Sequence, residues 1–433
     1  MRIGLFTDTY RPSINGIVFV LESLKNELEA RGHEVYIFCP GKKIISAPEA
    51  ELYEEDFHIV RYPSIKGAFF DDYDTSVFFP PRVVQQIRKL DLDIIHVFTP
   101  SQVGLVGVQA AIKNEVPFIM QHSTDLYEFS EDYPLVLPGL LALIGILLPT
   151  TVRLGRKDIA EVIKMYRPRR GMAKWNKDII RRAITMLYSR ADGVIALSEK
   201  SASQLESWQD EKYKYKITVM PNGVNAIPSP TDASLEKFRE KFGIAQDDEV
   251  FGFVGRLGKE KNLDMLIPTL EYVIHQRPKA RLLFVGDFEY RETLENLAIE
   301  SGYSSRITFT GALPRENLGV AYASMSVFVF PSMKDTQGWV LHEAAHAGLP
   351  ILLIDHGVTS VVKDGVNGYF VYNSPESVSD RLIELLSDNK LRKKMGEASK
   401  EIAATLTEEK QVQKLEKLYK HLVLNSHMAR GSE

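Results

Sequence analysis

The sequence contains a single cysteine, Cys39, among 433 residues. One cysteine excludes an internal disulfide, which fits a protein of a reducing compartment. Cys39 ends a strand-like apolar stretch, where a cysteine is far more often a small buried hydrophobic residue than a nucleophile. We therefore expect Cys39 to be structural.

The sequence also lacks an apolar run of the roughly 20 residues that a membrane-spanning helix needs. Its longest run, LVLPGLLALIGILLP, covers residues 135–149. The opening residues MRIGLFTDTY read as a strand and not as a leader with a charged and an apolar region. We therefore expect a cytoplasmic protein, in which residues 135–149 lie in a membrane interface or form a buried helix.

No strong charge of either sign is present, since the net charge is -4. This balance disfavours general nucleic-acid binding. The length, with 44% hydrophobic and 25% charged residues, indicates a globular protein of two domains.

Strand-like and helix-like stretches alternate along almost the whole chain, which is typical of parallel sheets covered by helices. The strand-like stretches are RIGLFTD, EVYIFCP, DIIHVFTP, PFIMQHS, DGVIALS and KITVMP, then EVFGFVGRL, ARLLFVGD, RITFTGAL, VFVFPS and PILLID. Between the two sets, PNGVNAIPSPTD interrupts the pattern and reads as a hinge. The pattern predicts an α/β protein with two Rossmann-like domains and a ligand cleft between them.

We place the N-terminal domain at residues 1–225 and the C-terminal domain at 226–405. A helix over 406–425 is expected to pack back across the hinge, and residues 426–433 are expected to be disordered.

Candidate ligand-binding residues follow three strands, where ligands bind in open α/β sheets. Gly16 stands at the start of a helix after the first strand, where a glycine permits close approach of a phosphate. Arg256 and Lys261 lie five positions apart in GRLGKEKN, a spacing that suits a diphosphate. Each signal alone is also compatible with a turn glycine and a solvated charge cluster.

The third group is SMKDTQGWVLHEAAHAGLP, in which Asp335 and Glu343 are eight positions apart with Gly338 between them. A helix that begins near Gly338 would point backbone N–H groups toward a ligand. Carboxylates accept hydrogen bonds from vicinal hydroxyls, so both acids suit a sugar or a ribose.

Together these motifs resemble the retaining GT-B glycosyltransferases of family four, whose hallmark is Glu-x7-Glu followed by Ala-x-Ala-x-Gly-x-Pro. This chain has Asp335-x7-Glu343 and then AAHAGLP, together with Arg256-x4-Lys261, Gly16, PNGV at 221–224 and KDGVNGYFV from Lys363. The resemblance extends over nearly the whole chain. It implies two Rossmann-like domains that face each other across a cleft.

The resemblance also implies roles for these residues. Arg256 and Lys261 would bind the donor diphosphate beside Gly16. Glu343 would bind the ribose hydroxyls. Asp335 would bind the donor sugar, together with Thr336, Gln337 and Gly338. His122 in QHSTDLYEF would lie beside the donor sugar. His122, Arg256, Lys261 and Asp335 form the expected catalytic set. The family's first glutamate is Asp335 here, one methylene shorter, and the HSTD spacing leaves open whether His122 or Asp125 approaches the sugar.

By the same resemblance, transfer would retain the anomeric configuration and would need neither a metal nor a cofactor. The leaving diphosphate would take the acceptor's proton, while Arg256, Lys261 and helix N-termini stabilise charge.

The acceptor side is indicated by residues 135–182, an apolar run followed by a basic stretch. From Arg153 to Arg182 the chain has 11 Lys or Arg and 3 Asp or Glu. Such a segment is typical of a membrane-surface element that binds anionic lipid, although it also fits a solvated basic face beside a buried helix. The candidate acceptor or membrane residues are Asp125, Arg153, Arg156, Lys157, Arg169, Arg170, Lys174 and Trp175.

The sequence thus predicts a hexosyltransferase that moves a hexose, glucose from UDP-glucose, to a lipid such as diacylglycerol. It would work at the inner face of the cell membrane as a peripheral protein. The sequence DTQG resembles the ETQG motif of bacterial glycosyl-diacylglycerol synthases. Mannosyl or galactosyl transfer to another lipid or to a soluble acceptor remains an alternative.

Three more distant alternatives remain. His-Glu-Ala-Ala-His at 342–346 has the H-E-x-x-H pattern of zinc proteases, with Glu376 as the available third ligand, but the stretch before Glu376 reads as strand, loop and hairpin. A nucleotide-sugar epimerase or hydrolase would use the same fold without a separate acceptor. An inactive membrane-binding homologue is suggested only by Asp335.

Overall fold

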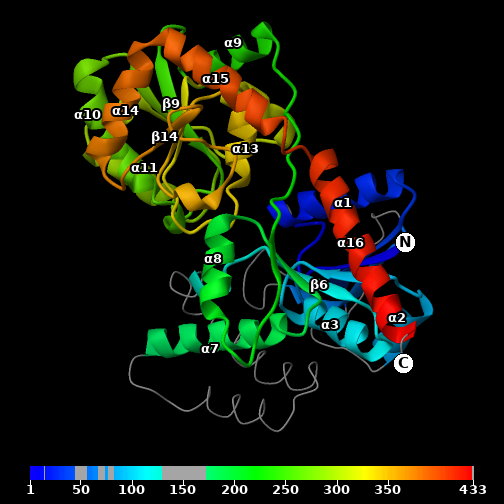
Figure 1. Ribbon diagram of the computed structural model, residues 1–433. Helices are drawn as coiled ribbons and strands as arrows, with labels where there is room; N and C mark the ends of the chain where they lie inside the picture. The colour runs from blue at the N-terminus through cyan, green and yellow to red at the C-terminus, as the bar shows by residue number, and fades with distance from the viewer. Residues whose placement is uncertain (14, 44–55, 67–73, 77–81, 129–171, 432–433) are drawn as a thin grey trace. The chain divides into compact units, whose positions relative to one another are not determined.

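The computed structural model describes the chain except for residues 14, 44–55, 67–73, 77–81, 129–171 and 432–433 (Figure 1). The chain divides into two compact units. Unit 1 comprises Met1–Asn222 and Glu408–Glu433, and unit 2 comprises Gly223–Thr407.

Unit 1 is built on a sheet with the strand order β4-β3-β2-β1-β5-β6-β7-β8. Every neighbouring pair is parallel except β3 and β4. The central strands are apolar because helices cover both of their faces. The strands are β1 (Arg2–Phe6), β2 (Glu34–Lys43), β3 (Ile59–Lys66), β4 (Asp74–Ser76), β5 (Ile94–Val97), β6 (Phe118–His122), β7 (Gly193–Ala196) and β8 (Ile217–Val219).

The helices of unit 1 cover this sheet with their apolar stripes. Helix α1 shows the helical spacing, with Val18, Leu21, Leu24 and Leu28 buried. Its N-terminus is capped by the side chain of Asn15, which accepts hydrogen bonds from two backbone N–H groups of the first turn. The helices are α1 (Gly16–Ala30), α2 (Arg82–Lys89), α3 (Gln102–Asn114), α7 (Met172–Tyr188), α8 (Glu199–Trp208) and α16 (Glu408–Gly431).

Helix α16 returns the end of the chain to unit 1, where it lies beside α1 (Figure 1). Val412, Leu415 and Tyr419 join the apolar cluster beneath α1. The Tyr419 hydroxyl lies 2.6 Å from Nδ1 of His96, a fully buried residue of β5. Both apolar and polar contacts therefore anchor the helix.

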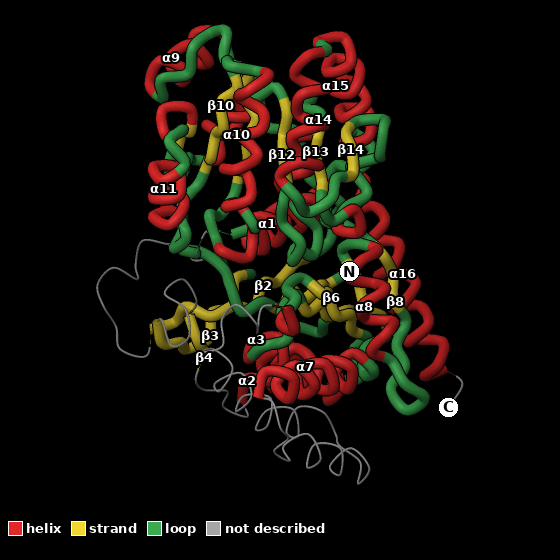
Figure 2. The backbone as a smooth tube through the Cα atoms, turned by 90° about the vertical axis from the view of Figure 1, so that its left-hand side faces the viewer, coloured by secondary structure: helices red, strands yellow, loops and turns green. Residues whose placement is uncertain are grey.

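Unit 2 is built on a fully parallel sheet with the order β11-β10-β9-β12-β13-β14, the order of a Rossmann fold. Its strands β10, β12, β13 and β14 can be followed in Figure 2. Its aromatic core includes Phe253, Phe328 and Phe330, which are at most 1% exposed. The strands are β9 (Glu249–Val254), β10 (Ala280–Val285), β11 (Ile307–Phe309), β12 (Val327–Phe330), β13 (Ile351–Leu353) and β14 (Gly368–Phe370).

Helices flank this second sheet on both sides (Figure 2). Helix α10 packs against α14, and α13 packs against α15. The helices are α9 (Asp232–Lys241), α10 (Leu266–Gln276), α11 (Arg291–Glu300), α12 (Leu318–Ala323), α13 (Trp339–His346), α14 (Pro375–Ser387) and α15 (Asn389–Ala403). Short 3-10 turns include η3 (Lys259–Lys261), η4 (Leu263–Met265) and η6 (Arg315–Asn317).

The two parallel-sheet units confirm the predicted α/β class with two Rossmann-like domains. The structure places the change of unit after residue 222, whereas the sequence suggested 225. The predicted disordered tail is wrong over residues 426–431, because α16 continues to Gly431. Residues 432–433 lie outside the described part of the chain.

Candidate functional site

The carboxyl ends of β9 and β12 form the switch point of unit 2, because the chain extends the sheet in opposite directions from these two neighbours. Ligands of open parallel sheets bind at such a point. The loop after β9 contains Arg256 and Lys261, and the loop after β12 contains Asp335. The fold therefore brings together two segments that are more than 70 residues apart in sequence.

Arg256 follows Gly255 directly after β9, and its side chain is 56% exposed. The guanidinium lies over the ring of Phe288, 4.8 Å from the ring centroid. One of its nitrogens, Nη2, is 3.3 Å from Oε1 of Glu260. The ring and the carboxylate thus hold the cation at the rim of the switch point, with much of its surface open to a ligand.

Lys261 and Asp335 form an ion pair across the switch point, with Nζ and Oδ1 2.7 Å apart. Their side chains are 13% and 19% exposed. Burial tends to raise the pKa of Asp335, but the Lys261 ammonium outweighs it and holds the pKa below its ordinary value. The other carboxylate oxygen, Oδ2, is buried near the Ser332 hydroxyl, which also lowers the pKa of Asp335, and neither group has a further hydrogen-bond partner among the described residues. A ligand hydroxyl would satisfy such groups.

The loop after Asp335 turns into α13 at Gly338, whose φ of 64° and ψ of 63° lie in the left-handed region. A Cβ atom on Gly338 would lie 2.6 Å from Cδ1 of Leu341, so the turn requires glycine. Thr336 and Gln337 belong to the same loop, and Gln337 is buried. The structure thus places Thr336, Gln337 and Gly338 beside Asp335 at the start of α13.

Glu343 lies one turn further along α13, with a side chain only 3% exposed. Its carboxylate accepts hydrogen bonds from the Tyr322 hydroxyl at 2.9 Å and from Trp339 Nε1 at 3.1 Å. Nη1 of Arg315 is 3.0 Å from Oε1 of Glu343. Burial raises the pKa of Glu343, and the Arg315 guanidinium opposes that rise. Among the described residues these three groups are the carboxylate's partners, and its assignment to a ribose stays a prediction.

In unit 1 the corresponding switch point lies between β1 and β5. Gly16 is the first residue of α1, and a Cβ atom there would have no heavy atom within 4 Å. Asn15 caps the helix and donates from Nδ2 to the Thr9 hydroxyl at 2.8 Å. Gly16 therefore has open space beside it, as the phosphate-side prediction requires.

Asp8, in the same loop, is a residue that the sequence reasoning missed. Its Oδ1 accepts a hydrogen bond from the backbone N–H of Val103 in the first turn of α3, and its Oδ2 accepts one from the Thr99 hydroxyl, both at 2.6 Å. Burial raises its pKa from 3.8 to about 6. An acid at the end of the strand-like stretch RIGLFTD was the only signal in the sequence, and its partners Thr99 and Val103 lie more than 90 residues away.

His122 ends β6 and is 1% exposed. Its Nδ1 lies 3.1 Å from the Tyr188 hydroxyl, and its Nε2 is buried without a partner among the described residues. Burial lowers the pKa of His122, so the ring is neutral at pH 7. Asp125 uses Oδ1 to accept hydrogen bonds from the backbone N–H groups of Tyr127 and Glu128, both at 3.1 Å. The role of either residue toward a sugar stays a prediction.

Most of the predicted acceptor segment lies outside the described residues. This applies to the apolar run at 135–149 and to Arg153, Arg156, Lys157, Arg169 and Arg170. Lys174 and Trp175 belong to the first turns of α7. Within the ranges that the structure describes, no helix combines the length and the apolar character needed to span a membrane.

The two histidines of the H-E-x-x-H pattern have other partners. His342 is fully buried and its Nε2 lies 3.4 Å from the Thr359 hydroxyl, while Nε2 of His346 lies 2.8 Å from the backbone carbonyl of Val224. Glu376, the third candidate ligand, accepts a hydrogen bond from the Tyr272 hydroxyl at 2.8 Å. No group of three or more His, Cys, Asp or Glu side chains able to hold a metal occurs among the described residues.

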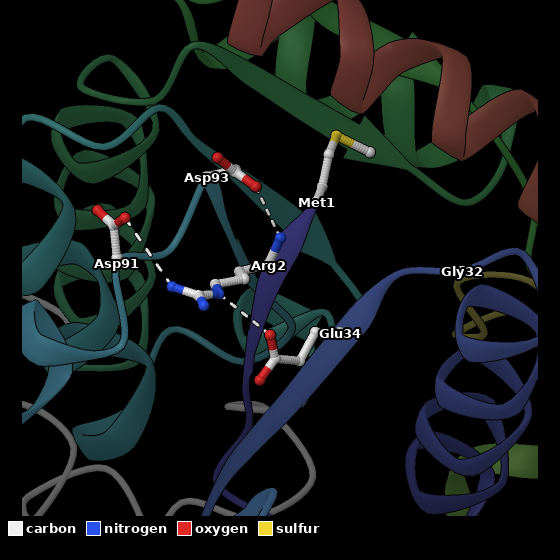
Figure 3. A pocket seen from close by; sticks show the side chains of 6 residues that line it. All are labelled: Met1, Arg2, Gly32, Glu34, Asp91 and Asp93. Carbon is white, nitrogen blue, oxygen red and sulfur yellow. Dashed lines mark hydrogen bonds and ion pairs between the residues drawn. The ribbon is translucent and has the colours of Figure 1, made fainter.

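A pocket lies at the end of the unit 1 sheet that is opposite the carboxyl ends of its strands. It is lined by Met1, Arg2, Gly32, Glu34, Asp91 and Asp93 (Figure 3). Arg2 and Glu34 begin β1 and β2, so the pocket lies at the amino ends of the strands. Nε of Arg2 is 3.0 Å from Oε2 of Glu34, and its backbone N–H donates to Asp93. These mutually paired groups lie away from the carboxyl ends, where the candidate residues gather.

Two family models match the chain. The model described as Glycosyltransferase Family 4 matches residues 14–226, and the model described as Glycosyl transferases group 1 matches residues 234–402. The chain is similar to the alpha-monoglucosyldiacylglycerol synthase of Acholeplasma laidlawii, with 28% identity over 89% of this chain and 88% of that protein. It is also similar to the GDP-mannose-dependent alpha-mannosyltransferase of Mycolicibacterium smegmatis, with 26% identity over 82% of this chain and 80% of that protein.

Solved structures share the fold. Sucrose-phosphate synthase from Thermosynechococcus elongatus matches with a TM-score of 0.69 and 18% identity, over 98% of this chain and 99% of that one. HepE of Anabaena, crystallised in complex with UDP and glucose, matches with a TM-score of 0.68 and 16% identity, over 97% of this chain and 100% of that one.

Proposed function

This chain belongs to the GT-B glycosyltransferases, with a family 4 domain followed by a group 1 domain, and on that premise we propose the reaction it performs. It transfers glucose from UDP-glucose to the hydroxyl of a lipid such as diacylglycerol, with retention of configuration. The observation on which the proposal rests is the group formed by Arg256, Lys261 and Asp335 at the carboxyl ends of β9 and β12.

Two cations and one acid at a switch point suit a sugar diphosphate. When the donor binds, Lys261 turns from Asp335 to the diphosphate, and Arg256 turns from Glu260. The negative charge on the diphosphate grows as the sugar leaves, so both cations stabilise the transition state more than the bound donor. Asp335, released from Lys261, accepts hydrogen bonds from the sugar hydroxyls, and Thr336, Gln337 and Gly338 contribute backbone N–H groups.

The same arrangement accounts for catalysis without a metal ion or cofactor. Arg256 and Lys261 supply the positive charge that a divalent cation supplies to phosphates elsewhere. The leaving diphosphate takes the proton of the acceptor hydroxyl as that hydroxyl attacks from the same face of the sugar. Positioning and charge stabilisation then account for most of the rate, with Gly16 giving the diphosphate room and His122 placed toward the sugar.

The acceptor belongs to unit 1 in this proposal. Residues 135–182 combine an apolar run with an excess of basic side chains, among them Lys174, and with the aromatic side chain of Trp175. Each basic residue near an anionic leaflet contributes about 1 kcal/mol, so several of them hold a protein reversibly at the membrane. The similarity to the alpha-monoglucosyldiacylglycerol synthase of Acholeplasma laidlawii supports a diacylglycerol acceptor and a glucose donor. We accordingly place the protein at the inner face of the cell membrane.

Mannosyl transfer from GDP-mannose is the second candidate, because a relative with that donor matches 82% of the chain. The crystal structure of HepE in complex with UDP and glucose favours the UDP-glucose assignment. Galactosyl transfer, a soluble acceptor, hydrolysis or epimerisation of the donor, and loss of activity remain outcomes of the experiment below.

The test incubates the full chain with UDP-glucose, UDP-galactose or GDP-mannose and with diacylglycerol in liposomes, with and without anionic phospholipid. Mass spectrometry identifies the product, and NMR of the anomeric proton establishes its configuration. We expect α-glucosyldiacylglycerol from UDP-glucose, faster on anionic liposomes, with unchanged rates in EDTA. Lys261→Ala should abolish turnover, while Lys279→Ala, which removes an exposed cation paired with Asp247, should not.

Absence of a glycolipid from every donor would exclude the lipid acceptor. Free sugar or an isomerised donor without acceptor would indicate a hydrolase or an epimerase. Loss of activity in EDTA that zinc restores would revive the metal-dependent alternative.

A further inference from the structure

Glu343 is a buried acid held by three donors from three elements of unit 2. Tyr322 comes from α12, Trp339 from the first turn of α13, and Arg315 from the 3-10 turn η6. Tyr322 is fully buried, whereas the Arg315 side chain is 35% exposed. Arg315 and the half-buried Trp339 therefore extend from the buried carboxylate toward the surface.

Arg315 is also the only one of the three donors that has a charge. Tyr322 and Trp339 are neutral donors, and burial raises the pKa of the Tyr322 hydroxyl well above its ordinary value. Without the guanidinium, the carboxylate would be a buried charge without a counter-charge, which favours protonation. His342 and His346, on the same helix, point their Nε2 atoms toward Thr359 and Val224 instead.

The protonation state of Glu343 decides what it can bind. An ionised carboxylate offers about four acceptor positions, of which the three donors occupy three. A protonated carboxyl loses acceptor capacity and presents an O–H that competes with a ligand hydroxyl. A fixed, ionised Glu343 can therefore accept a further hydrogen bond, whereas a protonated or rotated one cannot.

We propose that Arg315 is a positioning residue for the nucleotide: its guanidinium keeps Glu343 ionised and fixes the carboxylate so that it can accept a hydrogen bond from a ribose hydroxyl. This inference rests on the proposed function, which assigns Glu343 to the donor. No motif in the sequence singles out Arg315, because its partner lies 28 residues further along the chain.

The experiment measures nucleotide binding alone, without acceptor or turnover. Calorimetry compares UDP with 2′-deoxy-UDP, or GDP with 2′-deoxy-GDP if the protein prefers guanine, on the full-length wild type, Arg315→Gln and Arg315→Lys. Wild type should bind the ribonucleotide about 10- to 100-fold more tightly, the range for a hydrogen bond to a charged group. Arg315→Gln should lose most of that ratio, and Arg315→Lys should keep part of it.

A second readout is pH. The loss in Arg315→Gln should grow as the pH falls from 8 to 5.5, because the carboxyl without its counter-charge protonates at a higher pH. The matched control is Arg381→Gln on α14, which removes an exposed pair with Glu384 and should leave the ribose-to-deoxyribose ratio unchanged.

An Arg315→Gln variant that is folded and keeps the full ratio at every pH would overturn the inference while leaving the proposed function intact. If Arg315→Gln does not fold, Arg315→Ala takes its place, and a full ratio at every pH in that variant would overturn the inference equally. Absence of binding to any nucleotide by wild type would instead refute the proposed function itself. If wild type binds the ribonucleotide and the 2′-deoxyribonucleotide equally well, the assignment of Glu343 to the ribose is removed and the inference with it.

Discussion

Lys261 and Asp335 are each other's partners, with Nζ and Oδ1 2.7 Å apart and both side chains largely buried. The sequence motifs assign these two residues to different parts of one ligand, the diphosphate and the sugar. Because they are paired, a ligand that binds both must separate them. It must then offer Lys261 an anionic group in place of Asp335, and Asp335 a hydrogen-bond donor in place of Lys261. The site is therefore neutralised internally before the donor binds.

Removal of one member of this pair should destabilise unit 2, because it leaves the other as a buried charge without a counter-charge. We expect Lys261→Met or Asp335→Leu alone to lower the free energy of unfolding by about 3 kcal/mol. The double variant should lose less than the sum. Urea unfolding of the four proteins gives the coupling energy.

All three variants should be inactive, which separates the stability effect from the chemistry. Lys279→Met serves as the exposed control and should change stability by less than about 1 kcal/mol. Additive losses in the double variant would mean that the two charges do not depend on each other.

Gly16→Ala separates binding from folding in unit 1. A methyl group at this position meets no heavy atom within 4 Å, and Gly16 begins a helix, so alanine should leave stability unchanged or raise it by up to about 1 kcal/mol. If a diphosphate packs against this residue, the KM for the donor should rise about tenfold or more. Steady-state kinetics and thermal unfolding measure the two effects.

The control is Gly193→Ala, at the start of β7, where a Cβ atom would make an ordinary contact with Ile119 at 3.7 Å. Its donor KM should match the wild type. An unchanged KM in Gly16→Ala would remove Gly16 from the donor site.

Asp8 should make the protein less stable as the pH rises from 4 to 7. Its folded-state pKa of about 6 is above the ordinary 3.8, so folding favours the protonated form. The contribution is therefore fully present below about pH 4 and is lost as the pH rises through 6, by roughly 3 kcal/mol at about 1.4 kcal/mol per pH unit.

Asp8→Asn keeps an acceptor for the Val103 N–H and can donate from its amide to the Thr99 hydroxyl, although this amide cannot accept the longer hydrogen bond of 3.4 Å from the Gly104 N–H. The difference in unfolding free energy between Asp8→Asn and wild type should thus increase by roughly 3 kcal/mol from pH 4 to 7. Urea titrations at several pH values measure it. A constant difference would show that Asp8 titrates normally in the folded protein.

Sequence patterns predicted the fold well where strands are long and apolar, and less well elsewhere. Strand β3 was not expected, because Pro63 and charged residues interrupt its pattern and proline is rare inside sheets. Strand β14 has only three residues, and it pairs in parallel with β13 where a hairpin was expected. Both strands owe their existence to a neighbour that supplies hydrogen bonds, which local sequence does not reveal.

For the candidate site, spacing located the residues but not their partners. Arg256, Lys261 and Asp335 follow strands, and the sheet order places them together. The pairing of Asp8 with α3 and of Glu343 with Arg315 depends on side chains that meet only in the folded chain. Such contacts follow from packing and have no periodicity to detect.

The hydrogen bond between Tyr419 and His96 should contribute to the stability of unit 1. Burial lowers the pKa of His96 to about 3, against the opposing effect of Gln121, so the ring is neutral. Tyr419→Phe removes the partner of Nδ1 and should cost about 1–3 kcal/mol, equally at pH 6 and pH 8.

Tyr272→Phe is the control, because Tyr272 is exposed and bonds to an exposed glutamate, Glu376. It should change the unfolding free energy by less than about 0.5 kcal/mol. If the two substitutions change the unfolding free energy equally, the hydrogen bond of the Tyr419 hydroxyl does not contribute to the stability of unit 1.

The return of α16 to unit 1 has a consequence for synthesis on the ribosome. Unit 2 is one continuous segment, whereas unit 1 is completed only when Glu408 and the residues after it emerge. Until then the apolar surface under α1 stays exposed to solvent, because Val412, Leu415 and Tyr419, which cover it in the folded protein, have not yet been synthesised. Unit 2 can thus fold while its predecessor in sequence is still unfinished, and a ribosome that stalls before α16 leaves a nascent chain prone to aggregation.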